Sequence, residues 1–374
     1  MRFPEFADEW KQTTLGETCS VIGGGTPSTD VDDYWNGDIQ WFTPSEIGVN
    51  KFVSRSERTI TEQGMNNSGA KLLPLGTILL TTRATIGEAS IATCPCTTNQ
   101  GCQSLVINRR ITTTEFVYQK VETLKRELFS RANGSTFKEI SASEVRSIPI
   151  SLPSLAEQEK IAGFLSLIDE RIESCSETIK ERKREKAALL NQLFSQKLRF
   201  PQFSDEWQQT TLGEICTIKT GKLDANAMIE GGRYPFFTCA KQTYQTDTYS
   251  FSGEAILVAG NGEVGLTKYY NGKFNAYQRT YVLQSLRRDI ILRLIRNYID
   301  HALPKRIVSL RNGSAMPYIT LSTLRDMPIF LPSLAEQKKI ADFLSLIDER
   351  IEVEEELLEQ YEKQKRYLLR QMFV

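Results

Sequence analysis

The sequence contains two short motifs that could carry ligand chemistry. Gly260-Asn-Gly262-Glu-Val-Gly265 follows an apolar run and matches the glycine-rich loop that holds the pyrophosphate of a dinucleotide. That fold needs a helix after the loop, whereas residues 266–272 are typical of a strand and close in an Asn271-Gly272 turn. We therefore predict a hairpin loop here, and no cofactor bound by this chain.

The second motif is Cys94-Pro-Cys96, with Cys102 close by. A tetrahedral zinc site needs a second pair of ligands, which this cluster lacks. The single histidine, His301, is expected at the surface or at a helix cap, so a Ser-His-Asp mechanism would depend on one residue. The 7 cysteines are scattered over 374 residues and are predicted to be free thiols, because disulfide scaffolds are short and cysteine-dense. We predict no metal site.

Motifs for methyl transfer and ATP hydrolysis are also missing. The sequence has no Asn-Pro-Pro-Tyr or Asp-Pro-Pro-Tyr tetrapeptide. The Gly-Lys pairs at 221–222 and 272–273 are followed by Leu223 and Phe274, where a P-loop has Ser or Thr. The chain is therefore predicted to be non-catalytic.

Two internal repeats give the architecture. Residues 2–17 return almost unchanged as residues 199–214, and residues 152–173 return as residues 331–352 with only two differences. The interiors between these repeats differ. We interpret the near-identical parts as a frame that serves one repeated partner, and the divergent interiors as serving two different targets.

Each copy ends in a predicted long helix. Ser154-Leu-Ala-Glu157 and Ser333-Leu-Ala-Glu336 fit a capping box. Apolar residues then recur at alternating steps of three and four, which predicts a coiled-coil seam of about 60 Å in each helix. The seam residues are Ile161, Leu165, Ile168, Ile172, Cys175, Ile179, Leu189 and Leu193 in the first helix, and Ile340, Leu344, Ile347, Ile351, Leu358, Leu368 and Met372 in the second.

Connectivity predicts the direction of these helices. The second copy begins at Arg199, directly after the first helix, so no linker is long enough to return the chain. The second helix can then pack along the first only in the antiparallel sense. The predicted segments are a domain at 1–153, a helix at 154–198, a domain at 199–332 and a helix at 333–374, with one domain at each end of the helix pair.

Both interiors are predicted to be α+β, with short strands, irregular loops and one late helix. The expected helices span 115–129 and 289–301. The expected strands of the first copy are 39–42, 77–82 and 104–107, and their counterparts in the second are 234–237, 255–258 and 280–283.

Composition narrows the class of protein. Hydrophobic residues make up 40% and charged residues 25% of the chain, which are ordinary globular values. No apolar run reaches the length of a membrane span, and we expect a cytoplasmic protein. The formal net charge of zero disfavours a free-standing DNA binder, although residues 199–330 carry 16 basic against 11 acidic side chains.

Taken together, the sequence resembles the specificity subunits of Type I restriction-modification systems over essentially its whole length. The resemblance lies in residues 39–47, 68–77, 83–87 and 98–101 and in the doubled Leu-Pro-Ser-Leu-Ala-Glu-Gln helix starts. It implies two target-recognition domains, two spacer helices and a bipartite site in double-stranded DNA. It also implies assembly with two methyltransferase subunits and, through them, with restriction subunits. S-adenosylmethionine, ATP and magnesium would then belong to those partners.

Loop position and DNA chemistry suggest the contact residues. Arginine favours guanine, asparagine and glutamine favour adenine, and lysine favours phosphate. The candidates for base contacts are Arg83, Asn99 and Gln100 in the first domain and Asn261, Gln278 and Arg279 in the second, and those for phosphate contacts are Lys71, Lys222, Lys241 and Lys268. For each of them a solvated loop or a turn-stabilising side chain is the alternative.

Two other functions stay open at this point. An autonomous two-domain DNA-binding regulator predicts tight, specific DNA binding by the chain alone. A nuclease or methyltransferase in its own right predicts detectable activity without partners. The missing motifs disfavour this alternative.

Overall fold

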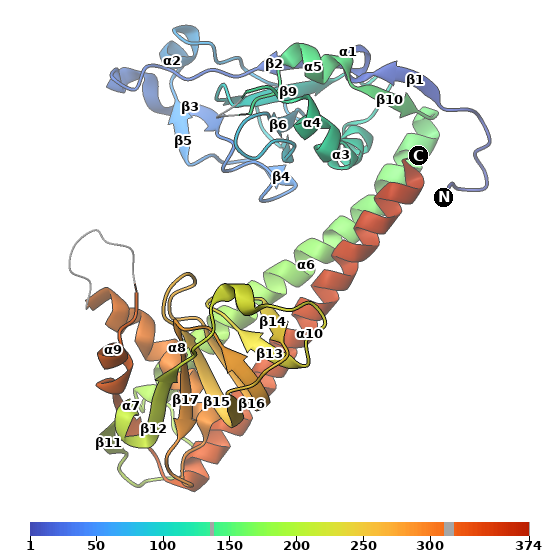
Figure 1. The fold of residues 1–374 in the computed structure, drawn as a ribbon. Coiled ribbons are helices and arrows are strands. Elements are labelled where there is room, and N and C mark those ends of the chain that lie inside the picture. The colour runs from blue at the N-terminus through green and yellow to red at the C-terminus, as the bar shows by residue number, and fades with distance from the viewer. Residues whose placement is uncertain (135–137, 310–317, 374) are drawn as a thin grey trace. The chain divides into compact units, whose positions relative to one another are not determined.

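The computed structural model describes residues 1–134, 138–309 and 318–373 and divides into two compact units. Unit 1 comprises Met1–Cys175 with Leu357–Val374, and unit 2 comprises Ser176–Glu356. Each unit is a β-rich domain completed by one end of each of two long helices (Figure 1). The predicted α+β class is confirmed. Among the described residues no helix is both long and apolar enough to cross a membrane.

The long helices are α6 (Leu155–Phe194) and α10 (Leu334–Met372). In unit 2, Lys183 contacts Glu355 at 2.5 Å and Lys186 contacts Asp348 at 2.5 Å, so residue numbers rise along one helix as they fall along the other. In unit 1, the first half of α6 meets the last part of α10, where Asp169 pairs with Lys365 at 2.6 Å. The predicted antiparallel pairing is confirmed.

The apolar residues expected at the seam are unequally covered. Ile161, Leu165, Ile168, Cys175, Ile179, Leu193, Ile340, Leu344, Ile351, Leu368 and Met372 are buried. Ile172, Leu189, Ile347 and Leu358 are half-buried. Leu190, next to the expected Leu189, is the buried residue of that turn.

The capping-box prediction is only half right. Ser154 accepts a hydrogen bond from the Glu157 backbone at 3.3 Å, and Ser333 accepts one from Glu336 at 3.5 Å. The glutamate side chains do not reach back to the serines. Each is instead held by an arginine and a tryptophan from the start of its own copy, a tertiary contact that a local motif cannot reveal.

These contacts join the two ends of each repeat. In unit 1, Arg2 donates two 2.7 Å hydrogen bonds to Glu157, and Trp10 Nε1 donates a third at 3.3 Å. Their partner Glu157 is 1% exposed. Unit 2 repeats the arrangement: Arg199 donates two 2.8 Å bonds to Glu336, and Trp207 donates one at 3.3 Å. The near-identical ends of the two repeats therefore form the same contact between arginine, tryptophan and glutamate in each unit. We call this contact the junction.

A two-stranded antiparallel sheet extends each junction. Strand β1 (Lys11–Thr14) pairs with β10 (Pro149–Leu152) in unit 1. Strand β11 (Gln208–Thr211) pairs with β18 (Pro328–Leu331) in unit 2. Short helices follow the first strand of each pair, α1 (Leu15–Thr18) and α7 (Leu212–Ile215).

The rest of unit 1 has two further sheets. The five-stranded sheet has the order β2-β9-β6-β7-β4 and the three-stranded sheet the order β5-β3-β8. The strands are β2 (Cys19–Gly23), β3 (Trp35–Phe42), β4 (Phe52–Val53), β5 (Arg58–Ile60), β6 (Ile78–Thr81), β7 (Ala89–Ala92), β8 (Cys96–Thr98) and β9 (Cys102–Ile107). The helices are η1 (Asp32–Tyr34), α2 (Glu62–Asn66), α3 (Thr114–Thr123), α4 (Lys125–Arg131) and α5 (Ala142–Ser147).

Unit 2 is built on one six-stranded sheet of order β12-β17-β15-β16-β13-β14 (Figure 1). The strands are β12 (Cys216–Thr220), β13 (Tyr234–Phe237), β14 (Thr243–Thr246), β15 (Phe251–Ala259), β16 (Thr267–Ala276) and β17 (Thr280–Ser285). The helices are η2 (Ala225–Ala227), α8 (Leu292–Ser309) and α9 (Leu321–Arg325). All six expected strands of the two interiors are present.

Three local predictions need correction. The helix expected at 115–129 is two helices, α3 and α4, separated by Leu124. Asn271-Gly272 lies inside β16, opposite Gly253 and Glu254 of β15, and makes no turn. His301 lies within α8, half-buried, with its ring 5.7 Å from that of Phe194.

Candidate nucleic-acid interface

The two units share one loop scaffold, although their sequences there differ. A hairpin loop joins β6 to β7 in unit 1 and β15 to β16 in unit 2. Gly87 donates to Thr81 O at 3.0 Å, and Gly265 donates to Ala259 O at 2.9 Å. Both glycines have positive φ angles, +93° and +85°. The glycine-rich motif is therefore a hairpin loop, as predicted, and is held in the same way as its counterpart.

A second loop lies against the first in each unit. It spans residues 99–101 in unit 1 and 277–279 in unit 2. Thr82 donates to Gly101 O at 2.8 Å, and Gly260 donates to Arg279 O at 2.9 Å. Asn99-Gln100 and Tyr277-Gln278 therefore occupy equivalent places in the two units. The candidate residues of both loops are thus gathered at one edge of each unit.

A third segment approaches the same edge through glycine. An added Cβ on Gly24 would lie 2.1 Å from Asn99 O, and one on Gly221 would lie 1.9 Å from Ala276 O. No side chain fits at either place. Gly221 puts Lys222 beside the second loop of unit 2, since residue 222 follows it directly in the chain.

In unit 1 most of the candidate side chains already have partners. Arg83 pairs with Glu139 at 2.7 Å. Asn99 Oδ1 accepts a 2.8 Å hydrogen bond from the Gly101 backbone, so it stabilises the turn. Gln100 Oε1 accepts a hydrogen bond from Thr26. Lys71 is exposed and has no partner among the described residues. Sequence reasoning missed Thr26, because only the tertiary structure brings it to this loop.

In unit 2 the candidates are more available. Lys268 is the exception: its Nζ donates to Gln242 O and Thr243 Oγ1 at 3.2 Å each, and burial lowers its pKa. The side chains of Asn261, Lys222 and Lys241 have no hydrogen-bond or ion-pair partner in the described part of the chain. The Lys241 backbone donates to Glu263 Oε1 at 2.8 Å, which ties it to the hairpin loop.

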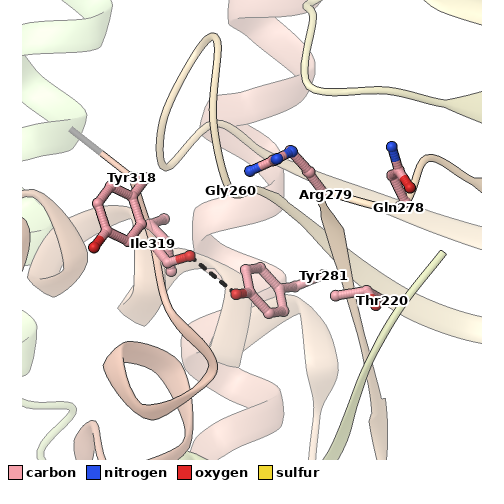
Figure 2. A pocket seen from close by; sticks show the side chains of 7 residues that line it. All are labelled: Thr220, Gly260, Gln278, Arg279, Tyr281, Tyr318 and Ile319. Atoms are coloured by element: carbon pink, nitrogen blue, oxygen red, sulfur yellow. Dashed lines mark hydrogen bonds between the residues drawn. The ribbon is translucent and has the colours of Figure 1, made fainter. Parts of the chain in front are cut away.

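The loops of unit 2 border a pocket of about 340 Å³. Figure 2 shows Tyr318 and Ile319 on one side of it, Thr220 and Gln278 on the other, and Tyr281 between them. The lining residues are Thr220, Gly260, Gln278, Arg279, Tyr281, Tyr318 and Ile319. Sequence reasoning missed both tyrosines. Tyr281 lies on β17, two residues after Arg279, and this closeness in sequence could have indicated it. Tyr318 is far from the candidate loops in sequence, so no sequence signal indicated it.

The cysteines do not form a ligand cluster. No group of three or more His, Cys, Asp or Glu residues among those described could hold a metal ion. Burial raises the pKa of Cys96 and of Cys102 to about 12, and that of Cys19 to about 11. Burial therefore keeps these thiols protonated, as is typical of structural cysteines.

Comparison with known proteins decides the family. The family model for the Type I restriction modification DNA specificity domain matches residues 7–182 and again residues 204–363. The chain belongs to this family. Members of the Type I specificity family recognise DNA, and DNA recognition is the role of this chain.

Similar proteins carry the same family name. A Type I restriction enzyme MjaIX specificity subunit from Methanocaldococcus jannaschii is 28% identical, over 92% of this chain and 88% of that relative. The EcoDI specificity subunit from Escherichia coli is 41% identical over a shorter region, 41% of this chain and 34% of that relative. A crystal structure of the S subunit from M. genitalium is similar in fold, with a TM-score of 0.66, 18% identity, and coverage of 100% of this chain and 97% of that one.

Proposed function

We propose that the chain reads a bipartite DNA target, with each unit recognising one half-site. The proposal rests on one observation: the two units hold the same loop scaffold with matching backbone hydrogen bonds, but display different side chains on it. A common scaffold that carries Gln100-Gly101 in one unit and Gln278-Arg279 in the other suits two different base sequences, because base edges are read by side chains.

The ten candidate residues then divide by availability. Those free of partners among the described residues are Lys71, Lys222, Lys241, Asn261, Gln278 and Arg279. Arg83, Asn99, Gln100 and Lys268 already make an internal hydrogen bond or ion pair, which shapes the loops and leaves only their remaining donors for DNA. Breaking one of these internal contacts would weaken the net gain on DNA binding.

We further propose that the catalytic steps belong to partner subunits, with two methyltransferase subunits docking on this chain and restriction subunits joining through them. The support is a surface that occurs twice. Leu155 and Leu167 of α6 are exposed, and Leu334 and Leu346 occupy the equivalent places on α10 and are equally exposed. Exposed leucines repeated in near-identical helices suit two copies of one partner.

Methylation mapping in a host with and without the gene tests the bipartite proposal. Long-read sequencing should find methylated adenines in a two-part motif that depends on this chain. A chain-dependent motif of one uninterrupted block would contradict the two half-sites. The autonomous regulator is the second candidate, and it is favoured instead if the purified chain alone binds one duplex sequence tightly and specifically.

A further inference from the structure

At one position the two loop scaffolds differ between no side chain and a long basic one. Gly101 and Arg279 correspond, because their carbonyl oxygens accept the matching hydrogen bonds from Thr82 and Gly260. An added Cβ at Gly101 would lie 2.9 Å from Pro44 Cγ, so unit 1 has little room for a side chain there. Unit 2 carries an arginine at this place. The scaffold therefore presents a long basic side chain in one unit and bare backbone in the other.

The backbone that carries Arg279 is fixed from several sides. Tyr277 N donates to Phe237 O at 2.9 Å, and Gln278 N donates to Leu223 O at 3.0 Å. Arg279 O accepts from Gly260 N at 2.9 Å and from Cys239 Sγ at 3.3 Å. Because the backbone is held by neighbouring segments, a contact made by the side chain loses only side-chain entropy.

The side chains of Gln278 and Arg279 are exposed to solvent and make no polar contact with the described part of the chain. Neither has a hydrogen-bond or ion-pair partner among residues 1–134, 138–309 and 318–373. In the same unit the side chains of Arg199, Arg287, Arg296, Arg306 and Arg325 bind carboxylates or backbone carbonyls, whereas exposed Arg288, like Arg279, has no such partner among the described residues. An arginine left without a partner keeps its full donor capacity for an external acceptor.

The adjacent pocket explains why Arg279 stays uncommitted. No carboxylate is among the described residues that line it, in contrast to Glu139, which binds Arg83 in unit 1. The Tyr281 hydroxyl donates to Ile319 O at 2.9 Å, so it is not turned towards Arg279 (Figure 2). Tyr318 is 66% exposed on the far side. The pocket therefore gives the guanidinium open space and no internal anion.

We propose that Arg279 and Gln278 determine the base specificity of unit 2, with Arg279 reading a guanine and Gln278 an adenine beside it in the major groove. The proposal rests on the proposed function and narrows it to two residues in one unit. A guanidinium presents two parallel donors that match guanine O6 and N7, and a carboxamide presents the donor and acceptor that match adenine N7 and N6. Unit 1 has no equivalent of Arg279 and reads its half-site by other residues.

The test is methylation mapping with the full-length chain in complex with its methyltransferase subunit. Arg279→Ala should relax the motif at a single guanine of one half-site, where discrimination falls roughly tenfold to a hundredfold. Gln278→Ala should relax the neighbouring position. The other half-site stays as in the wild type in both variants.

Arg287→Ala is the matched control. Arg287 is an exposed arginine of the same unit, pairs with Asp289, and follows the opposite end of β17. Its removal should leave both half-sites unchanged. Arg279→Lys keeps the charge but loses the planar paired donors, so discrimination at the guanine should fall below the wild type, though less than in Arg279→Ala, because lysine can still donate to guanine.

Three results would overturn the proposal. The first is an unchanged motif in Arg279→Ala at the wild-type extent of methylation. The second is an even loss of methylation with no altered base preference, which indicates a phosphate contact. The third is full discrimination in Arg279→Lys, which is also decisive if Arg279→Ala fails to assemble. Failure of the proposed function is a separate result, in which the wild-type chain directs no methylation, or directs it to a motif of one uninterrupted block.

Discussion

Asp169 of α6 and Lys365 of α10 form a 2.6 Å ion pair in unit 1, and the same pair recurs in unit 2 as Asp348 with Lys186 at 2.5 Å. Each residue lies 179 positions from its counterpart, the spacing of the helix repeat in the sequence. The two helices therefore meet in the same register in both units. The internal duplication is preserved in the packing as well as in the sequence.

We predict that this pair contributes to helix pairing in unit 2. A double-mutant cycle of Lys186→Met and Asp348→Asn should give a coupling energy of about 0.5–1 kcal/mol, because the lysine is largely buried while the aspartate stays partly exposed. The coupling should shrink in 1 M salt. The exposed Glu359–Lys363 pair within α10 is the control, and its coupling should be smaller because both side chains are solvated. Urea unfolding measures both, and zero coupling at Lys186–Asp348 contradicts the prediction.

The common register predicts that residues 1–198 alone form a symmetric dimer. The core of unit 1 uses Leu369 and Met372 from the end of α10, and Phe373 directly after it. In the half-length chain, Leu190, Leu193 and Phe194 of a second copy can occupy those places, and Asp169 can face Lys186 of that copy.

Sedimentation should show twice the monomer mass, and with methyltransferase the dimer should modify a palindromic bipartite site. Lys186→Asp in the half-length chain should weaken the dimer. A half-length chain that stays monomeric and inactive with excess partner rules the prediction out.

Gln158 and Gln337 should stabilise the two junctions to a similar degree. The Gln158 carboxamide accepts from Thr112 and Thr113 and donates to the carbonyls of Ile111 and Pro153. Gln158→Leu leaves these buried groups unpaired, which should lower the free energy of unfolding by about 1–3 kcal/mol. Calorimetry or urea unfolding measures the loss.

The equivalent Gln337 accepts from Ile291 and donates to Asp289 and Pro332. Gln337→Leu should cost a comparable amount in unit 2. Gln364→Leu, an exposed glutamine of α10, is a control that should change stability by less than about 0.5 kcal/mol. An equal effect of all three substitutions counts against the buried network.

Asp300 should make stability depend on pH. Burial raises the pKa of this carboxyl, although Thr267 donates to it and Arg296 lies nearby. Because the folded pKa lies above the unfolded value, the folded protein favours the protonated acid, and stability is lost as pH rises through the folded pKa. Asp300→Asn should therefore be more stable than the wild type at pH 7. The difference should vanish below about pH 3.9, where the unfolded carboxyl is also protonated. Equal stabilities of Asp300→Asn and the wild type at pH 7 would contradict the prediction, because the ionised carboxylate would then be fully stabilised by its neighbours.

The repeated leucines should carry partner binding. Leu167 is 60% exposed and Leu346 is 59% exposed, so replacing either with aspartate costs little folding energy. Each of Leu167→Asp and Leu346→Asp should weaken one methyltransferase contact by roughly tenfold or more, and the double variant should weaken both. Mass photometry of the mixture counts the bound subunits. Val353→Asp, at an exposed position with no equivalent apolar residue on α6, is the control. Wild-type stoichiometry and affinity in the double variant would contradict the proposed docking surface.

The sequence by itself determined the features that repeat or alternate. The duplicated segments gave the long helices, and the connection at Arg199 is too short for any route except an antiparallel one. The strands of both interiors were predicted from short apolar runs between turn residues, because strand periodicity is local. The hairpin at Gly260–Gly265 was also predictable, since the apolar pattern after it suits a strand.

Only the tertiary structure decided which polar side chains already have a hydrogen-bond or ion-pair partner within the chain. Glu157 looked like a local cap but is bound by Arg2, 155 residues away. Arg83 and Arg279 looked alike in sequence, yet one meets Glu139 and the other borders a pocket whose described lining has no carboxylate. Hydrogen bonds and ion pairs between distant segments depend on the folded chain, and no spacing rule along the sequence reports them.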